Sequence, residues 1–118
     1  MGELASSLTL PSQAKLTSID IAINKAFTAA GHKAPTSTYT SNAQTAKNFL
    51  PGGPGYSIHN SNRGKFTLIG GGVPFEVEGK VVGAIGVSTG TPAQDAEVAQ
   101  AGVEAVGAWV RRRGGSKL

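Results

Sequence analysis

The chain has 118 residues, a net charge of +4 and no cysteine, and only 15% of its residues are charged. This length suits one domain with one core over residues 1–118. The lack of cysteine excludes disulfides, zinc–thiolate sites, iron–sulfur clusters and cysteine nucleophiles. No apolar run approaches the roughly 20 residues of a membrane helix, and no secretory leader is evident, so the sequence predicts a cytoplasmic protein without a membrane span.

The first elements predicted along the chain are a short strand and an amphipathic helix. Spaced leucines before Pro11 indicate a strand over residues 4–10. A helix is predicted from Thr17 or Ser18 to residue 30, with Gly31 just beyond its end, because apolar residues recur at three- and four-residue spacing. This apolar stripe consists of Ile19, Ala22, Ile23, Ala26, Phe27 and Ala30.

The middle of the chain is polar and rich in glycine and proline. Residues 36–48 predict a second, weaker helix. The Pro-Gly-Gly-Pro-Gly run at residues 51–55 predicts a stiff loop without regular structure, which would deliver Tyr56 and His59 to a defined place. His32, the other histidine, is expected to be exposed or to cap helix carbonyls. The two histidines do not have the spacing of metal ligands, so no metal site is predicted.

The clearest local signals lie between residues 62 and 100. Residues 66–69 predict a strand, and Gly70-Gly71-Gly72 then lets the backbone take a positive φ or approach another group closely. Two β-rich runs, residues 73–78 and 80–88, flank Glu78-Gly79 and predict a hairpin. Pro74 has no N–H, so it suits the first residue or the free edge of a strand.

The last predicted element is a long helix. Thr91 is the expected N-cap, Pro92 the first helical residue and Gln94 the partner that closes a capping box. The apolar stripe of this helix is Val98, Ala101, Ala105, Val106, Trp109 and Val110. The arginines at residues 111–113 complement the negative end of the helix dipole. They are not interleaved with stacking aromatic residues, so nucleic-acid binding is not predicted.

Three stretches of this chain resemble a known family. Residues 70–102, GGGVPFEVEGKVVGAIGVSTGTPAQDAEVAQAG, are similar to the signature of the GlcG/HbpS family, which includes the C-terminal domain of PduO. Residues 16–30, LTSIDIAINKAFTAA, and residues 51–72 agree in the same order. Together with the elements above, the resemblance implies an α+β domain of profilin-like layout. Its antiparallel sheet would have about four or five strands, with helices packed on it.

The resemblance implies small-molecule binding, with a haem or another flat, anionic ligand in a pocket near the triple glycine at a subunit boundary. Among the residue types that ligate haem iron, His59 is the preferred candidate, because the glycine-proline loop is expected to hold it next to Gly70, Gly71 and Gly72. Pro74 follows the triple glycine and is expected to contact the same ligand.

The alternative is a cofactor-free enzyme, such as an isomerase, lyase or decarboxylase, that acts on a small carboxylate. The N–H groups of Gly70–Gly72 would bind the anion, and His59 would act as general acid or base. Tyr56 would donate a hydrogen bond, and Lys25 would be the counter-cation unless it is simply a surface lysine. A third option is a structural subunit that has lost its pocket.

The family pattern usually begins with a helix and a first strand that pairs with the strand expected here at residues 4–10. This sequence starts near the turn between those two strands, so it is expected to lack both elements. An unpaired strand edge exposes N–H and C=O groups and invites another chain to pair with it. We therefore expect a homo-oligomer in which a neighbouring subunit covers this surface.

Overall fold

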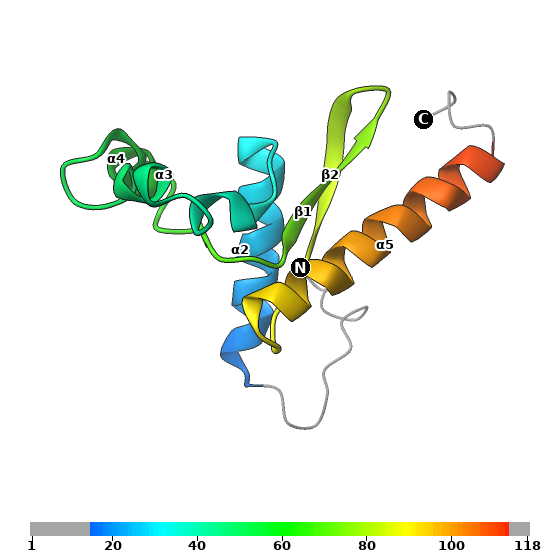
Figure 1. Ribbon diagram of the computed structural model, residues 1–118, viewed down its shortest axis with the longest axis horizontal. Coiled ribbons are helices and arrows are strands. Elements are labelled where there is room, and N and C mark those ends of the chain that lie inside the picture. Colours follow the sequence, from blue (N-terminus) through cyan, green and yellow to red (C-terminus); the bar gives the residue numbers. More distant parts are fainter. Residues whose placement is uncertain (1–14, 114–118) are drawn as a thin grey trace.

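The computed structural model describes residues 15–113, which form an α+β arrangement around one hairpin (Figure 1). Its elements, in chain order, are α2 (Thr17–His32), the 3-10 helix η1 (Thr36–Tyr39), α3 (Ala43–Lys47), α4 (Pro54–Ser61), β1 (Gly72–Val77), β2 (Lys80–Gly86) and α5 (Pro92–Arg112). The described residues contain a two-stranded antiparallel sheet. The strand expected at residues 4–10 lies outside the described residues. None of the described helices is long and apolar enough to cross a bilayer.

The predicted hairpin is confirmed, and its turn explains why it closes tightly. Glu78 and Gly79 both have positive φ, at 53° and 78°, which is the backbone twist that two-residue hairpin turns require. Gly72 pairs with Gly86 and Val77 with Lys80, and the register shifts between Phe75 and Glu76. The second strand ends at Gly86, two residues earlier than predicted.

Pro74 directs its nitrogen to the edge of β1 that has no paired strand within residues 15–113, which suits its missing N–H. The N–H of Val87 donates to the carbonyl of Gly71 at 2.8 Å, so these two residues form a hydrogen-bonded pair just before the strand begins. Hydrogen-bonded and non-hydrogen-bonded pairs alternate along an antiparallel ladder. Pro74 lies three residues after Gly71, so it belongs to a non-hydrogen-bonded pair and its nitrogen points away from β2. The N–H of Gly72 also points outward, and it donates to Thr36 Oγ1 at 2.9 Å.

The two long helices pack on opposite faces of the hairpin. A side chain added at Gly86 would collide with the backbone of Ala22 and Ala26, so α2 lies against that face of β2. A side chain at Gly102 would meet Ile85, which points to the other face, so α5 covers that side. Small residues at these crossings allow the helix backbones to approach the sheet closely.

Four sequence-based expectations of secondary structure are wrong. Residues 66–69 form no strand. The helix expected over residues 36–48 is two short pieces, η1 and α3. Gly31 lies inside α2, and Lys33 takes the left-handed conformation that ends the helix, with φ 57°. The glycine-proline run is only partly a loop, because Pro54 is the first residue of α4.

The capping box of α5 is confirmed, but its predicted apolar stripe is largely uncovered. Thr91 Oγ1 accepts from the N–H of Gln94, and the Gln94 side chain accepts from the N–H of Thr91. Of the predicted stripe only Val110 is buried, whereas Val98 and Trp109 are 59% and 49% exposed. The face that α5 buries instead runs through Asp95, Ala99 and Val110.

Gly71→Ala should destabilise the fold by about 2–4 kcal/mol, because a side chain there needs both a positive φ and occupied space. Gly71 has φ 128°, and its added Cβ would lie 2.5 Å from the Val87 oxygen and 2.7 Å from Lys25 Nζ. Urea denaturation measures the loss. Gly83→Ala is the matched control, since no atom lies within 4 Å of its added Cβ. Equal stability of the two variants would contradict this account of the triple glycine.

Candidate functional site

A buried ion pair joins elements that are far apart in the sequence. Lys25 Nζ on α2 lies 3.1 Å from Asp95 Oδ2 on α5, and the two side chains are 1% and 6% exposed. Lys25 also donates to the Val87 carbonyl at 2.8 Å, and Asp95 Oδ1 accepts from the N–H of Gly90 at 2.9 Å. Each charge therefore has a second hydrogen-bond partner, which a buried pair needs to offset desolvation. Lys25 is a buried, paired residue, and the expectation of a surface lysine is wrong.

The triple glycine packs against this ion pair. Gly70, Gly71 and Gly72 are all buried. A Cβ at Gly70 would lie 2.8 Å from the Pro92 oxygen, and one at Gly72 would collide with the Lys25 backbone. The N–H of Gly72 is already bonded to Thr36, a buried residue whose hydroxyl donates to the Ile69 carbonyl at 2.7 Å. The three glycines thus allow α2, η1 and α5 to pack closely against this segment.

His59 and Tyr56 lie on α4, which projects to the left in Figure 1 together with α3. His59 Nδ1 accepts a hydrogen bond from the N–H of Phe66 at 3.2 Å, so the neutral ring carries its proton on Nε2. The two rings have centroids 5.6 Å apart. Tyr56 is 37% exposed. Within the described residues, no hydrogen bond joins the His59 side chain to Gly70, Gly71 or Gly72.

A histidine–tyrosine pair that the sequence did not indicate lies beside this helix. His32 Nδ1 and Tyr39 Oη are 2.5 Å apart. Partial burial lowers the pKa of His32 and raises the pKa of Tyr39, so at neutral pH the tyrosine hydroxyl donates to a neutral imidazole. Phe49 and Phe66 pack around the pair. His32 was expected to be exposed or to cap carbonyls. Its actual partners come from three separate segments, so no local pattern could identify them.

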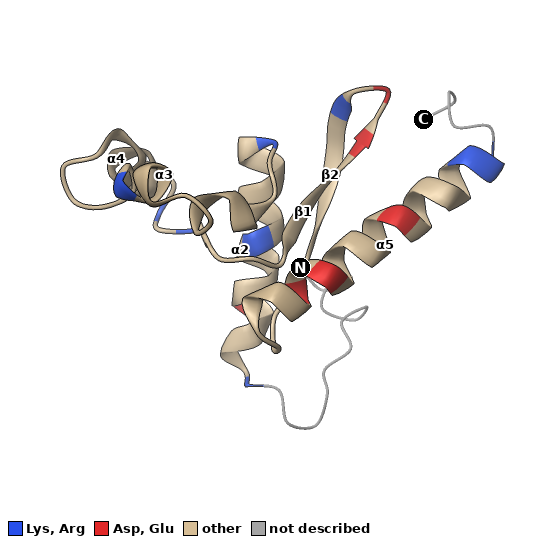
Figure 2. Ribbon diagram, in the orientation of Figure 1, with Lys and Arg blue, Asp and Glu red and all other residues tan. Residues whose placement is uncertain are grey.

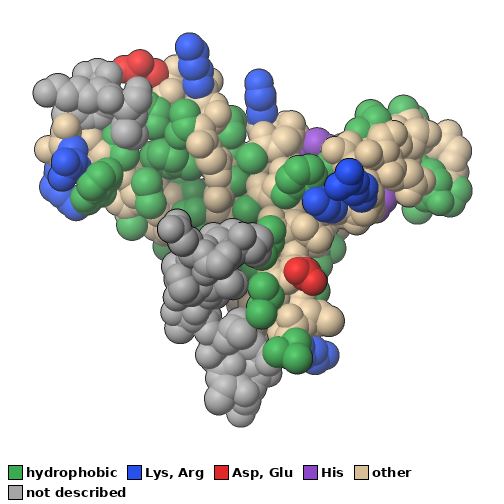
Figure 3. All heavy atoms as spheres, turned by 180° about the vertical axis from the view of Figure 1, so that it is seen from behind, with side chains coloured by type: hydrophobic (Ala, Val, Ile, Leu, Met, Phe, Trp, Pro, Cys, Tyr) green, Lys and Arg blue, Asp and Glu red, His purple; other side chains and the backbone are tan. Residues whose placement is uncertain are grey.

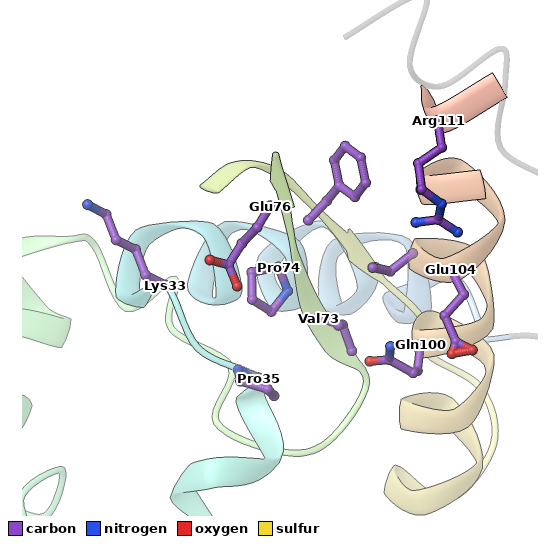
Figure 4. Close-up of a pocket in the computed structure, with 11 residues that line it drawn as sticks. Lys33, Pro35, Val73, Pro74, Glu76, Gln100, Glu104 and Arg111 are labelled. Atoms are coloured by element: carbon purple, nitrogen blue, oxygen red, sulfur yellow. The ribbon is translucent and has the colours of Figure 1, made fainter. Parts of the chain in front are cut away.

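A groove with a volume of about 450 Å³ runs between β1 and α5 (Figure 4). Its apolar wall is Val73, Pro74, Phe75 and Val103, and its charged groups are Lys33, Glu76, Glu104 and Arg111. Among the predicted site residues, Pro74 lines this groove, and it lies two residues after the triple glycine. The ion pair between Lys25 and Asp95 is the one ion pair found within residues 15–113, so the charged groups of the groove are not neutralised by one another.

The groove combines an apolar wall with two cations, Lys33 and Arg111, and two carboxylates, Glu76 and Glu104. It contains no histidine, cysteine, methionine or tyrosine among its lining residues. It could hold an apolar, carboxylate-bearing molecule, with Lys33 and Arg111 near its acidic groups. An iron ligand of a usual type would have to come from outside the groove.

Comparisons with known proteins agree on one family. The family model described as haem degrading protein HbpS-like matches residues 2–104. An uncharacterized 15.0 kDa protein from the dhaT-dhaS intergenic region of Citrobacter freundii is 37% identical over 89 residues, which cover 75% of this chain and 58% of the relative.

Two solved structures are similar in fold. The Klebsiella pneumoniae protein ORFY gives a TM-score of 0.67 at 33% identity and covers 81% of this chain and 62% of its own. The PduOC:heme complex also gives a TM-score of 0.67, at 29% identity, and covers 82% and 66%. This chain therefore spans less than two thirds of the length of these relatives.

Removing one partner of the buried ion pair should cost more stability than removing both. Lys25→Met or Asp95→Leu alone leaves a buried charge without its partner, and we expect each to lose about 3–5 kcal/mol. The double variant Lys25→Met/Asp95→Leu should lose clearly less than the sum of the single losses. A double-mutant cycle from urea denaturation measures this coupling. Additive losses would show that the two side chains do not act as a pair.

Stability should fall on acidification through His32. Because the pKa of His32 is lowered on folding, the folded chain binds fewer protons than the unfolded chain below about pH 6.5. His32 therefore contributes its full stabilisation above about pH 6.5. This stabilisation is lost as the pH falls through the lowered pKa that His32 has in the folded chain. The effect should be modest, since the side chain is only partly buried. Urea midpoints between pH 8 and 5 should shift less in His32→Gln than in the wild type, while His59→Gln retains the shift due to His32.

Proposed function

Because the chain belongs to the HbpS-like family, we propose that it binds haem or a similar flat, anionic molecule. The observation that carries this proposal is the match to the family model over residues 2–104, together with the fold it shares with the PduOC:heme complex. The cavity most suited to such a ligand in the described residues is the groove between β1 and α5. A volume of about 450 Å³ is within the usual range for ligand pockets.

The chemistry of the groove supports a carboxylate-bearing ring system. Val73, Pro74, Phe75 and Val103 offer an apolar wall for the ring. Lys33 and Arg111 can pair with carboxylates at its edge, provided that these lie on the side away from Glu76 and Glu104, which line the same groove. Haem bound here would bring an iron centre, but the groove itself supplies no usual iron ligand. We therefore propose that a ligand of the iron comes from outside the lining residues of the groove.

We assign that role to His59 of a neighbouring subunit. His59 lies on α4, whose Ile58 is 53% exposed and whose neighbour Leu50 is 58% exposed, so this projecting region has apolar surface available for a second chain. Ligation requires His59 to release its hydrogen bond from the Phe66 N–H, at a cost of about 1 kcal/mol. In this proposal a homo-oligomer closes each groove.

The cofactor-free enzyme lacks an observation that favours it. The Gly72 N–H that would bind an anion donates to Thr36, and the Lys25 ammonium that would balance charge is held by Asp95 and Val87. We therefore do not propose it as a second function.

Hemin titration tests the proposal. Wild-type protein should develop a Soret band with saturable binding, and Arg111→Glu should weaken binding at least about tenfold because a carboxylate would replace the cation. Lys80→Glu, the same charge reversal outside the groove, should bind as the wild type does. A wild-type protein that gives no saturable band contradicts the proposed function. Equal binding by Arg111→Glu places the ligand elsewhere.

Mixing variants tests whether His59 acts across the subunit boundary. His59→Ala and Arg111→Glu should each bind hemin weakly, while an equimolar mixture re-formed from separated subunits should regain about a quarter of the sites in a two-fold dimer. Each restored site combines an intact groove from one chain with His59 of the other. Loss of binding in His59→Ala without recovery in the mixture would show that His59 acts within its own chain.

A further inference from the structure

Helix α5 contains two glycines in its interior, and packing within the described chain explains only one of them. Glycine is less favourable in a helix interior than every residue except proline, so each position needs a reason. At Gly102 an added Cβ would lie 2.9 Å from Ile85 Cδ1, so β2 leaves little room for a side chain. At Gly107 an added Cβ would lie 3.4 Å from Arg111 Nη1 and 4.0 Å from Phe75 Cε1, which are ordinary contact distances. The fold therefore has room for alanine at Gly107, yet the residue is glycine.

Gly107 lies where the groove continues into a second cavity. This cavity, which we call the tip pocket, has a volume of about 270 Å³ and is lined by Phe75, Glu76, Val77, Glu78, Gly107, Val110 and Arg111. Gly107 is one of the four residues that line both the groove and the tip pocket, and the other three have large side chains. A side chain added at Gly107 would therefore narrow the passage between the two cavities. Hydrophobic side chains gather over α5 and the hairpin, the elements that form both cavities (Figure 3).

The charges around the tip pocket determine which part of a ligand can enter it. Glu76 and Glu78 supply two carboxylates to this pocket, and Arg111 supplies one cation. Figure 2 shows these acidic residues at the end of β1 and in the hairpin turn, whereas the end of α5 is basic. A ligand carboxylate inside the tip pocket would meet two like charges, so it is favoured in the groove, which Lys33 lines. The tip pocket, with the buried Val110 in its wall, therefore suits an uncharged edge of a ring.

We propose that Gly107 determines the size of the ligand, because its missing side chain lets a flat ring lie against the α5 backbone and extend from the groove into the tip pocket. Glycine commonly serves this purpose where a ligand approaches the backbone closely. The inference rests on the proposed function and specifies it: the ligand is a large planar macrocycle with its carboxylates at one edge. A single aromatic acid fits in the groove alone and does not need to cross Gly107.

Gly107→Ala should change stability and binding in opposite directions. Urea denaturation should show a higher midpoint, because alanine favours the helix and its Cβ meets only ordinary contacts. Hemin titration should show binding weakened about tenfold, because the methyl group takes the place of the ring. Gly102→Ala is the matched control: its midpoint should fall, since Ile85 is in the way, and its hemin affinity should stay within about twofold of the wild type. A variant that gains stability cannot have lost binding by misfolding.

Metal-free protoporphyrin separates contact with the ring from ligation of the iron. Gly107→Ala should weaken protoporphyrin binding, followed by fluorescence, by the same factor as hemin binding, and Gly107→Leu should abolish both by filling the passage. A wild-type protein that binds neither compound contradicts this inference and the proposed function together. If the wild type binds them and Gly107→Leu binds them equally well, only the role of Gly107 is refuted.

A second background separates Gly107 from its neighbour Arg111. Because Arg111 Nη1 would lie nearest to an added Cβ, alanine could act by displacing the guanidinium rather than the ring. In Arg111→Gln protein, the further change Gly107→Ala should still weaken protoporphyrin binding by about the same factor, since the two effects are then independent. Loss of the effect in that background would show that the glycine acts through Arg111, and it would overturn the direct contact with the ligand.

Discussion

The buried Lys25–Asp95 pair is the constraint on which the arrangement of the described chain depends. It connects α2 to α5 across 70 positions of sequence. Lys25 also donates a hydrogen bond to the carbonyl of Val87, which directly follows β2. Burying two charges is costly, so the pair must be enclosed and fully hydrogen-bonded to be tolerated. Gly71 makes that enclosure feasible, since any larger residue would occupy the space of the Lys25 ammonium and the Asp95 side chain. Packing alone therefore requires the triple glycine, independently of any role in ligand binding.

Features of the fold that depend on neighbouring residues could be predicted from the sequence. The capping box at Thr91 and the hairpin turn at Glu78-Gly79 are determined by a few adjacent side chains and backbone angles. The partner of Lys25 could not be predicted in this way. Asp95 occupies the first turn of a helix, where the dipole alone accounts for a carboxylate, so nothing marked it as one half of a buried pair. Tertiary contacts, which sequence spacing does not encode, determined its role.

The same limit applies to the candidate site. Sequence spacing placed His59 beside the triple glycine on an irregular loop, whereas Pro54 starts a helix and His59 lies on that helix, bonded to the Phe66 N–H. Periodicity correctly marked one side of α5 as apolar. It could not show that the chain buries a different side, through Asp95 and Ala99, because the helix is oriented by the ion pair. The apolar stripe predicted for the core is therefore largely exposed in the described residues, with Val98 and Trp109 at 59% and 49%.

The buried core of the described residues contains few apolar side chains. Its hydrophobic residues are Ala29, Val73, Ala99 and Val110, whereas large residues such as Val98 and Trp109 are exposed. Burial of apolar area is the main favourable term in folding, so the exposed side chains contribute little to it. Buried polar residues such as Lys25, Thr36 and Asp95 complete the core, and their hydrogen bonds hold the helices to the hairpin and to the triple glycine. The arrangement of α5 therefore depends more on a few specific polar contacts than on the apolar periodicity of its sequence.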